Sequence, residues 1–275
     1  MADAASYHFD LRHKATAKGA TPDDGAAHLA RLTADPARAN PVDIVQVGLG
    51  AMQLGEAWLP VVDGVAAWIE RTADDRGGIA YRFPMPHTYA LAPPWYSGLA
   101  QGEAASFLVR AAEPLGRSGL HELAERVAAP LLSPDSGLVV ATAEGPVLEE
   151  YPTSPPSYVL NGWIIALFGL HDVGAVDAFD AGVESLASRL HRYDTAIGWS
   201  RYDLYPHRFT NVASPWYHRF HVELLRTLDT LAPRPAFGET ADRWHTAAAN
   251  PATAGFALSR KALFRLARPR WRQLG

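Results

Sequence analysis

Two adjacent glutamates follow the best strand candidate in the sequence. Glu149 and Glu150 stand directly before Tyr151 in the segment EEYPT (149–153). Two interpretations are open. Such a pair is commonly solvated at the surface. Alternatively, one carboxylate points inward, and burial beside a like charge raises its pKa into the range that a general base needs. In that case the proline of the turn would hold the Tyr151 hydroxyl at the same cleft.

Two further tyrosines, Tyr202 and Tyr217, flank a loop rich in cations and histidines, although the chain as a whole has a net charge of −4. The plain interpretation is a basic loop beside two core tyrosines. The functional interpretation is a local positive zone that attracts an acidic substrate and lowers the pKa of a tyrosine from about 10. The residues of this zone are Arg201, His207, Arg208, His218, Arg219 and His221.

Several other chemistries find no support in the sequence. Cysteine is absent, which excludes disulfides, thiol catalysis and thiolate metal sites. His218 and His221 lie one helical turn apart, but neither an HExxH pattern nor an acidic partner at ligand spacing accompanies them, so we predict no metal site. Gly48-Leu49-Gly50 is a lone fragment of a nucleotide-binding loop.

Composition predicts a globular protein that does not bind nucleic acid over its whole surface. The chain has 275 residues, of which 48% are hydrophobic and 20% charged. We interpret the basic run near the C-terminus as a solvated helix rather than a track for a polyanion. The N-terminus has no apolar run of signal-peptide length, and no stretch of the chain approaches the roughly 20 apolar residues that span a bilayer, so we expect a cytoplasmic protein without a membrane partner. The basic run comprises Arg260, Lys261, Arg265, Arg268, Arg270 and Arg272.

The elements that must position these residues follow a repeated order: a long apolar helix, a short break and an amphipathic helix. Helical hairpins that need a neighbour to cover their apolar side tend to close into a ring. We therefore predict a mainly all-α fold, an incomplete (α/α) toroid with a small β-hairpin, in which loops rim a central cleft. Residues 1–40 form an N-terminal arm and residues 41–275 the toroid in this interpretation. Helices are predicted over 24–33, 42–69 (kinked or divided at Pro60), 97–115, 119–132, 157–170, 177–193, 217–231, 238–249 and 259–268. Extended pieces are predicted over 77–86 and 138–151, with a turn at Gly145-Pro146.

Five segments, in order and over most of residues 90–230, resemble the C-terminal catalytic region of the D-glucuronyl C5-epimerases. That family converts glucuronic to iduronic acid within heparosan or heparan sulfate. The segments are WYSGLAQGEAASFLVRA (95–111), EEYPT (149–153), VLNGWIIALFGLHD (159–172), YDTAIGWSRYDL (193–204) and NVASPWYHRFHVELL (211–225).

The resemblance implies an incomplete (α/α) toroid, no redox cofactor, and catalysis by tyrosines and a glutamate. Motif by motif, these roles fall on Glu150, Tyr151, Tyr202 and Tyr217. The family typically has Arg-His directly after YDL, whereas this chain continues Tyr205-Pro206-His207-Arg208. If an arginine clamps the uronate there, Arg208 or Arg201 must provide it.

Inverting C5 of a uronate requires removal of the proton next to the carboxylate and its return on the other face of the ring. We expect Glu150 or a tyrosine to remove the proton and a tyrosine hydroxyl to supply the other. Which carrier serves which face stays open. The expected substrate-binding residues are Trp95, Tyr96 and Trp216 as stacking walls, and Gln101, Asn161 and His218 as hydrogen-bond partners, beside Arg201 and Arg208.

The expected partner is therefore an acidic polysaccharide, and a homodimer is compatible with this interpretation. Two alternatives stay open at this point. A uronate polysaccharide lyase shares the proton abstraction but then expels the C4 substituent. A non-catalytic glycan-binding protein would keep the aromatic residues and would have no need of Glu150.

Overall fold

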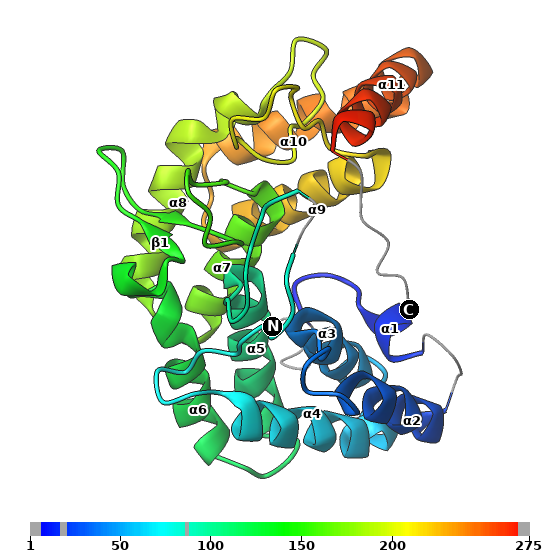
Figure 1. The fold of residues 1–275 in the computed structure, drawn as a ribbon, viewed down its shortest axis with the longest axis vertical. Helices are drawn as coiled ribbons and strands as arrows, with labels where there is room; N and C mark the ends of the chain where they lie inside the picture. Colours follow the sequence, from blue (N-terminus) through cyan, green and yellow to red (C-terminus); the bar gives the residue numbers. More distant parts are fainter. Residues whose placement is uncertain (1–6, 17–20, 86–87, 269–275) are drawn as a thin grey trace.

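Four inner and four outer helices form the body of the molecule in a computed structural model, which describes residues 7–16, 21–85 and 88–268 (Figure 1). Each inner helix packs against the next inner one and against the outer helix that follows it in the chain. The inner helices are α3 (Pro41–Met52), α5 (Gly98–Ala112), α7 (Leu160–Asp172) and α9 (Pro215–Leu231). The outer helices are α4 (Leu59–Thr72), α6 (Gly119–Ala128), α8 (Val176–Arg189) and α10 (Pro235–Ala249). The predicted mainly α-helical, incomplete toroid is confirmed.

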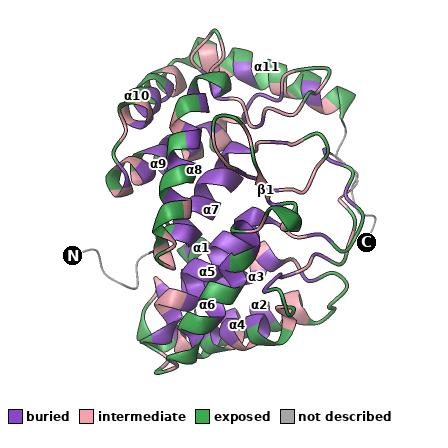
Figure 2. Cartoon of the chain, turned by 90° about the vertical axis from the view of Figure 1, so that its left-hand side faces the viewer, coloured by how far each residue is buried: buried purple, intermediate pink, exposed green. Residues whose placement is uncertain are grey.

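The inner and outer positions follow from how apolar each helix is around its circumference. Eleven of the 13 residues of α7 are buried, whereas only four of the 15 residues of α10 are. A helix that is apolar on all sides must be covered on all sides, and an amphipathic one covers it with a single face. Figure 2 shows this directly, with α5 and α7 largely buried and the outward faces of α6, α8 and α10 exposed. Close contact of α5 with α7 depends on Gly102 and Gly169, since a Cβ on Gly169 would lie 2.5 Å from the Gly102 Cα.

Prolines set the starts of several helices. α2 (Pro22–Thr33), α3, α9, α10 and α11 (Pro251–Ala267) all begin with proline, where its missing N–H leaves no hydrogen bond unmade. Of the two outcomes predicted at Pro60, a kink or a division, the structure shows a division, and the break lies before Pro60. α3 ends at Met52, and α4 begins at Leu59 with Pro60 in its first turn. Short 3₁₀ turns cover Glu56–Trp58, Ala129–Leu131, Pro134–Ser136 and Leu190–Tyr193.

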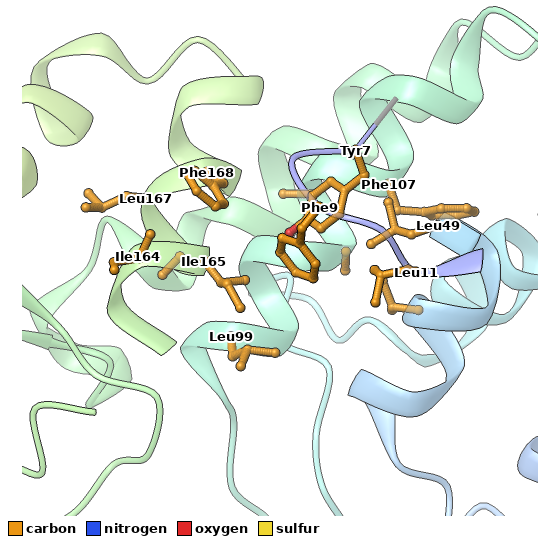
Figure 3. Packing of buried hydrophobic residues seen from close by; sticks show 14 of the residues in the cluster. Tyr7, Phe9, Leu11, Leu49, Leu99, Phe107, Ile164, Ile165, Leu167 and Phe168 are labelled. Atoms are coloured by element: carbon orange, nitrogen blue, oxygen red, sulfur yellow. The ribbon is translucent and has the colours of Figure 1, made fainter. Parts of the chain in front are cut away.

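The N-terminal segment packs into the core. Tyr7, Phe9 and Leu11 are buried and lie beside Leu49 of α3 and Phe107 of α5 (Figure 3). The chain then forms α1 (Arg12–Ala15), which packs on α3. The side chain of Gln53, the residue directly after α3, holds this segment. Its Oε1 accepts from the Leu11 N–H at 2.7 Å, and its Nε2 donates to the Phe9 carbonyl at 2.8 Å. The division of the chain at residue 40 stays a prediction.

The β-structure is smaller than the predicted extended pieces. β1 (Val139–Val140) and β2 (Val147–Leu148) pair antiparallel, and the turn between them contains Gly145 at φ +104°. Around residues 77–85, single bridges such as Tyr81 to Trp95 take the place of a continuous strand. Pro86, Arg270 and Arg272, which belong to segments discussed above, lie outside the described residues. Within the described ranges, no helix is both long enough and apolar enough to cross a bilayer.

Candidate active site

Two adjoining cavities open where the loops after β2 and before α9 meet. The larger has a volume of about 970 Å³ and the smaller about 520 Å³. Both have Met85, Tyr151 and Tyr217 in their walls. Of the residues that the sequence analysis selected, the larger is lined by Trp95, Glu150, Tyr151, Asn161, Trp216 and Tyr217, and the smaller by Tyr151, Tyr202 and Tyr217.

The two glutamates after β2 are both buried, with 1% and 5% of their surface exposed, but they have different surroundings. Glu149 accepts hydrogen bonds from the backbone N–H groups of Ser157 and Tyr158 at 2.8 and 2.9 Å, and from the Ser157 hydroxyl at 2.5 Å. It therefore fixes the loop that leads into α7. Glu150 faces the larger cavity. Neither glutamate belongs to a solvated surface pair.

The Glu150 carboxyl sits in a tight pocket against the start of α7. Asn161 Nδ2 donates to Glu150 Oε2 at 3.2 Å, and the Tyr151 hydroxyl is also hydrogen-bonded to this carboxyl group. Gly162 makes the approach possible, since a Cβ there would lie 2.3 Å from the Glu150 Cβ. Burial raises the pKa of Glu150 to about 7, partly offset by the hydrogen bonds from Tyr151 and Asn161. A carboxyl group with this pKa is suited to exchange protons near neutral pH.

Tyr202 and Tyr217 form a second hydrogen-bonded pair. Their rings meet edge to face with centroids 4.9 Å apart. Burial, with the nearby Glu150 charge as the next cause, raises the pKa of Tyr202 well above 10. The same two causes raise the pKa of Tyr151. The expectation that neighbouring cations lower a tyrosine pKa is therefore wrong for Tyr151 and Tyr202, whose hydroxyls are neutral proton donors at rest.

Aromatic side chains form walls of the larger cavity, as expected for Trp95 and Trp216. Trp95 stacks on Tyr81 with centroids 3.9 Å apart, and its indole N–H donates to the Phe83 carbonyl at 2.9 Å. Trp216 is 58% exposed and lies edge-on to Tyr217. A large exposed indole at the mouth of a cavity is suited to stack on a sugar ring.

Two of the expected hydrogen-bond partners serve the fold and line neither cavity. The Gln101 amide is fully buried, accepts from the Ile79 N–H at 2.8 Å and donates to the Val127 carbonyl at 2.6 Å. His218 is stacked on Trp199, its Nδ1 accepts from the Ser200 N–H at 3.0 Å, and its Nε2 lies 2.9 Å from the Trp244 carbonyl. Burial lowers the pKa of His218 to about 4, so it brings no positive charge.

Three other selected residues also lie away from these cavities. The Tyr96 hydroxyl is hydrogen-bonded to Asp74. Arg201 lines a separate cavity of about 390 Å³, and Arg208 is exposed beside Phe209. We therefore do not include Tyr96, Arg201 or Arg208 in the candidate site, and neither arginine lies where the expected uronate clamp would need it.

One group of side chains among the described residues could surround a metal ion, and it lies outside these cavities. It consists of His8, His171 and Asp172. The Asp172 carboxylate is already paired with the Arg110 guanidinium, whose Nη1 lies 2.6 Å from one carboxylate oxygen and whose Nη2 lies 3.2 Å from the other. His8 also lies 3.0 Å from Asp172. The cluster is thus explained as an ion pair that ties the N-terminal segment to α5 and α7.

Seven of the ten residues that line the smaller cavity were not predicted from the sequence, among them Tyr89, Asn211, Lys261 and Arg265. Tyr89 donates to the buried Asp203 carboxylate at 2.5 Å and packs against the Tyr151 ring. Asn211, Lys261 and Arg265 are also part of the wall, the last two from the basic run that we interpreted as a solvated helix. Their spacing of four residues was an available signal, because residues i and i+4 share one face of a helix.

Known proteins with similar sequences indicate the family to which the chain belongs. The family described as "D-glucuronyl C5-epimerase C-terminus" matches residues 73–246, more than half of the chain. The chain belongs to this family. A D-glucuronyl C5-epimerase of Caenorhabditis elegans is 32% identical over 208 residues, which cover 65% of this chain and 33% of the relative. The chain thus spans about a third of the length of that curated relative.

A solved structure supports the fold of this epimerase-family chain. The unsaturated glucuronyl hydrolase of Bacillus sp. GL1, described as responsible for the degradation of glycosaminoglycan, superposes with a TM-score of 0.50. The match covers 82% of this chain and 67% of the hydrolase, at 16% sequence identity. At that identity the likeness concerns the arrangement of helices alone.

The part of the chain that matches the epimerase family contains Glu150, Tyr151, Tyr202 and Tyr217. Lys261 and Arg265 lie outside it, as do Phe9 and Lys14, which line the larger cavity. The walls of the two cavities therefore combine the family-matched part with segments from both sides of it.

Proposed function

We propose that this chain inverts C5 of glucuronate residues in a heparosan-like polysaccharide, by removing the C5 proton and returning one to the opposite face. The observation that carries the proposal is the buried Glu150 carboxyl, hydrogen-bonded to Tyr151 in a cavity whose wall also contains Tyr217. Membership of the D-glucuronyl C5-epimerase family supports the reaction class, and the name of the Caenorhabditis elegans relative supports the substrate.

In this proposal Glu150 and Tyr151 work as one base. The Tyr151 pKa is raised, so a free tyrosinate would be costly to form. If the Tyr151 oxygen takes the C5 proton while its own phenolic proton passes to Glu150, no free tyrosinate is needed. Direct removal by the Glu150 carboxylate is the shorter alternative. In both cases the C5–H electron pair moves into the carboxyl group of the substrate and forms an aci-carboxylate dianion.

The second hydrogen-bonded pair, Tyr202 and Tyr217, is suited to the return step. Burial raises the pKa of Tyr202, so its neutral hydroxyl can donate to the developing carbanion, and the proton leaves the tyrosine as a new C5–H bond forms on the other face. The tyrosinate left behind takes a proton from water, and Glu150 releases its proton to water, before the next turnover. Trp95 and Trp216 would stack on neighbouring sugars, and Asn161 would keep Glu150 in place.

Incubation of the protein with heparosan in deuterated water tests the proposal. We expect deuterium at C5 of both glucuronate and iduronate residues, read by mass spectrometry and NMR, with chain length unchanged. Ultraviolet absorbance from unsaturated ends would indicate a uronate lyase, and new reducing ends a hydrolase. Binding without any of these changes would indicate a glycan-binding protein, and each of these three results would contradict the proposal.

A further inference from the structure

One face of α11 turns two cations toward the tyrosines of the smaller cavity. Ala257 and Phe264 are buried, while Lys261 and Arg265 are half-buried beside them. These four positions are spaced by three or four residues and so share one face of the helix. Arg260 is exposed and lines the separate cavity of about 390 Å³. In Figure 1, α11 lies at the end of the molecule where α9 and α10 also meet.

Lys261 is held in a defined position. Its Nζ donates to the Asn211 Oδ1 at 2.6 Å and lies 5.3 Å from the centre of the Tyr202 ring. The orientation of the Asn211 amide is fixed, because turning it around would break the hydrogen bond that its Nδ2 donates to the buried Asp203 carboxylate at 2.5 Å. The ammonium group is thus fixed beside one of the proposed proton carriers.

Arg265 lies one turn further along and also reaches the cavity wall. Its Nη1 donates to the Thr88 hydroxyl at 3.3 Å, and its guanidinium lies 5.6 Å from the centre of the Phe264 ring. Both cations therefore lie at the wall of the smaller cavity, Lys261 beside the Tyr202 ring and Arg265 beside the Thr88 hydroxyl.

The two cavities differ in charge. The larger is lined by Asp10, Asp43, Glu150 and Glu223 beside His13 and Lys14. Among the described residues that line the smaller cavity, Lys261 and Arg265 are the charged side chains, and none is acidic. The buried Asp203 carboxylate lies behind this wall, hydrogen-bonded to Tyr89 and Asn211, and offsets part of the positive charge. Two cations beside one carboxylate still favour an anionic group in the smaller cavity over the larger one, where carboxylates predominate.

We propose that Lys261 and Arg265 of α11 bind the carboxylate of the uronate residue whose C5 reacts. The inference rests on the function proposed above, and it assigns to this helix the clamp that the loop arginines do not provide. Because the negative charge on that carboxylate grows as the C5 proton leaves, two fixed cations stabilise the transition state more than the bound substrate. Neutral parts of the polysaccharide would then occupy the larger cavity.

The test compares two ligands, a heparosan oligosaccharide and the same oligosaccharide with its carboxyl groups reduced to alcohols. Binding to the wild type, to Lys261→Met, to Arg265→Met and to the double variant is measured by calorimetry at low salt. Arg260→Met is the matched control, since it removes a cation from the same helix but from another face. Thermal unfolding of each variant reports whether the fold is kept.

We expect the wild type to prefer the acidic ligand, each single variant to lose roughly 10-fold of that preference, and the double variant to lose nearly all of it. Affinity for the reduced ligand should stay within about 3-fold throughout, and Arg260→Met should behave as the wild type. A double variant that keeps the preference for the acidic ligand would overturn the inference, as would a wild type without such a preference.

The outcome is separable from that of the deuterium experiment, because binding needs no chemistry. Loss of the acid preference in a protein that does not exchange C5 protons would support the carboxylate site and contradict the epimerase reaction. If the double variant exchanges C5 protons at the wild-type rate, this would support the epimerase reaction and contradict the carboxylate site.

Discussion

The family-matched part of the chain, residues 73–246, differs in its contribution from the segments on either side of it. The matched part contains Glu150 and the three tyrosines proposed to carry protons. The N-terminal segment adds Phe9 and Lys14 to the larger cavity, and α11 adds Lys261 and Arg265 to the smaller one. Under the two proposals above, the proton transfers and the selection of the substrate's charge reside in different parts of the chain. Substitutions in the two regions should therefore change different quantities.

The largest effect is expected from the tyrosines of the matched part. Phenylalanine at position 151, 202 or 217 removes one hydroxyl and keeps the ring, so each variant should lose roughly 100-fold or more in the rate of C5 exchange. Its midpoint of thermal unfolding should change little, because a lost hydroxyl hydrogen bond costs about 1 kcal/mol.

Controls for this series must lie outside the cavities. Tyr89 and Tyr81, which the sequence alone would offer as ordinary tyrosines, both line a cavity wall. Tyr96 is suitable, because its hydroxyl is hydrogen-bonded to Asp74 away from the site. If two of the three variants exchange as fast as Tyr96→Phe, the proposed roles of the tyrosines are wrong.

The next largest effect is expected at Gly162. A Cβ at this position would lie 2.3 Å from the Glu150 Cβ and 2.6 Å from its Oε2, so Gly162→Ala must displace the proposed base. We expect the exchange rate to fall by roughly 10-fold or more, because even a small displacement of the Glu150 carboxyl from the reacting proton slows the proton transfer. Gly119→Ala on the outer helix α6 is the matched control, with no atom within 4 Å of the added Cβ. Equal activity of the two variants would show that Glu150 does not need its present position.

A smaller and graded effect is expected from pH. The base must be ionised, and the Glu150 pKa is raised to about 7, so kcat/KM should increase with pH below about 7 and level off above it. Rates of C5 exchange between pH 5.5 and 8.5 would show this rise. A profile that is already flat from pH 5.5 upward would mean that no group with such a pKa acts as the base.

The smallest effect on activity is expected from the polar residues that serve the fold. Gln101→Ala leaves the Ile79 N–H and the Val127 carbonyl without their side-chain partner, which should cost about 1–3 kcal/mol in the free energy of unfolding. The kcat of C5 exchange should stay within about 2-fold of the wild type at a temperature where both are folded. Denaturant unfolding and exchange kinetics on the same sample separate the two quantities.

The helical architecture could be predicted because hydrophobic periodicity distinguishes inner from outer helices. α7 is apolar all round and is almost wholly buried, and EEYPT has the inward carboxylate that one of the two interpretations required. Gln101 and His218 show the limit of this reasoning. A polar side chain within an apolar helix can face a cavity or satisfy a distant backbone group, and the sequence does not distinguish these outcomes.

The cations of the site show the same limit from the other side. Lys261 and Arg265 belong to a basic run, and charge alone does not tell which face of a helix is covered. The burial of Ala257 and Phe264, which turns this face inward, depends on how α11 packs against α9 and α10. That packing is a tertiary property. Whether the loop arginines or the cations of α11 line the cavity therefore depends on tertiary structure as well.

The central claim is that the buried Glu150 carboxyl is the base for the C5 proton, and Glu150→Gln tests it most directly. Glutamine keeps the size and polarity of the side chain while it removes the ability to accept a proton. We predict that deuterium incorporation at C5 of heparosan falls by roughly 100-fold or more, while affinity for the oligosaccharide stays within about 3-fold of the wild type. Incorporation at close to the wild-type rate in a folded Glu150→Gln protein would contradict the account.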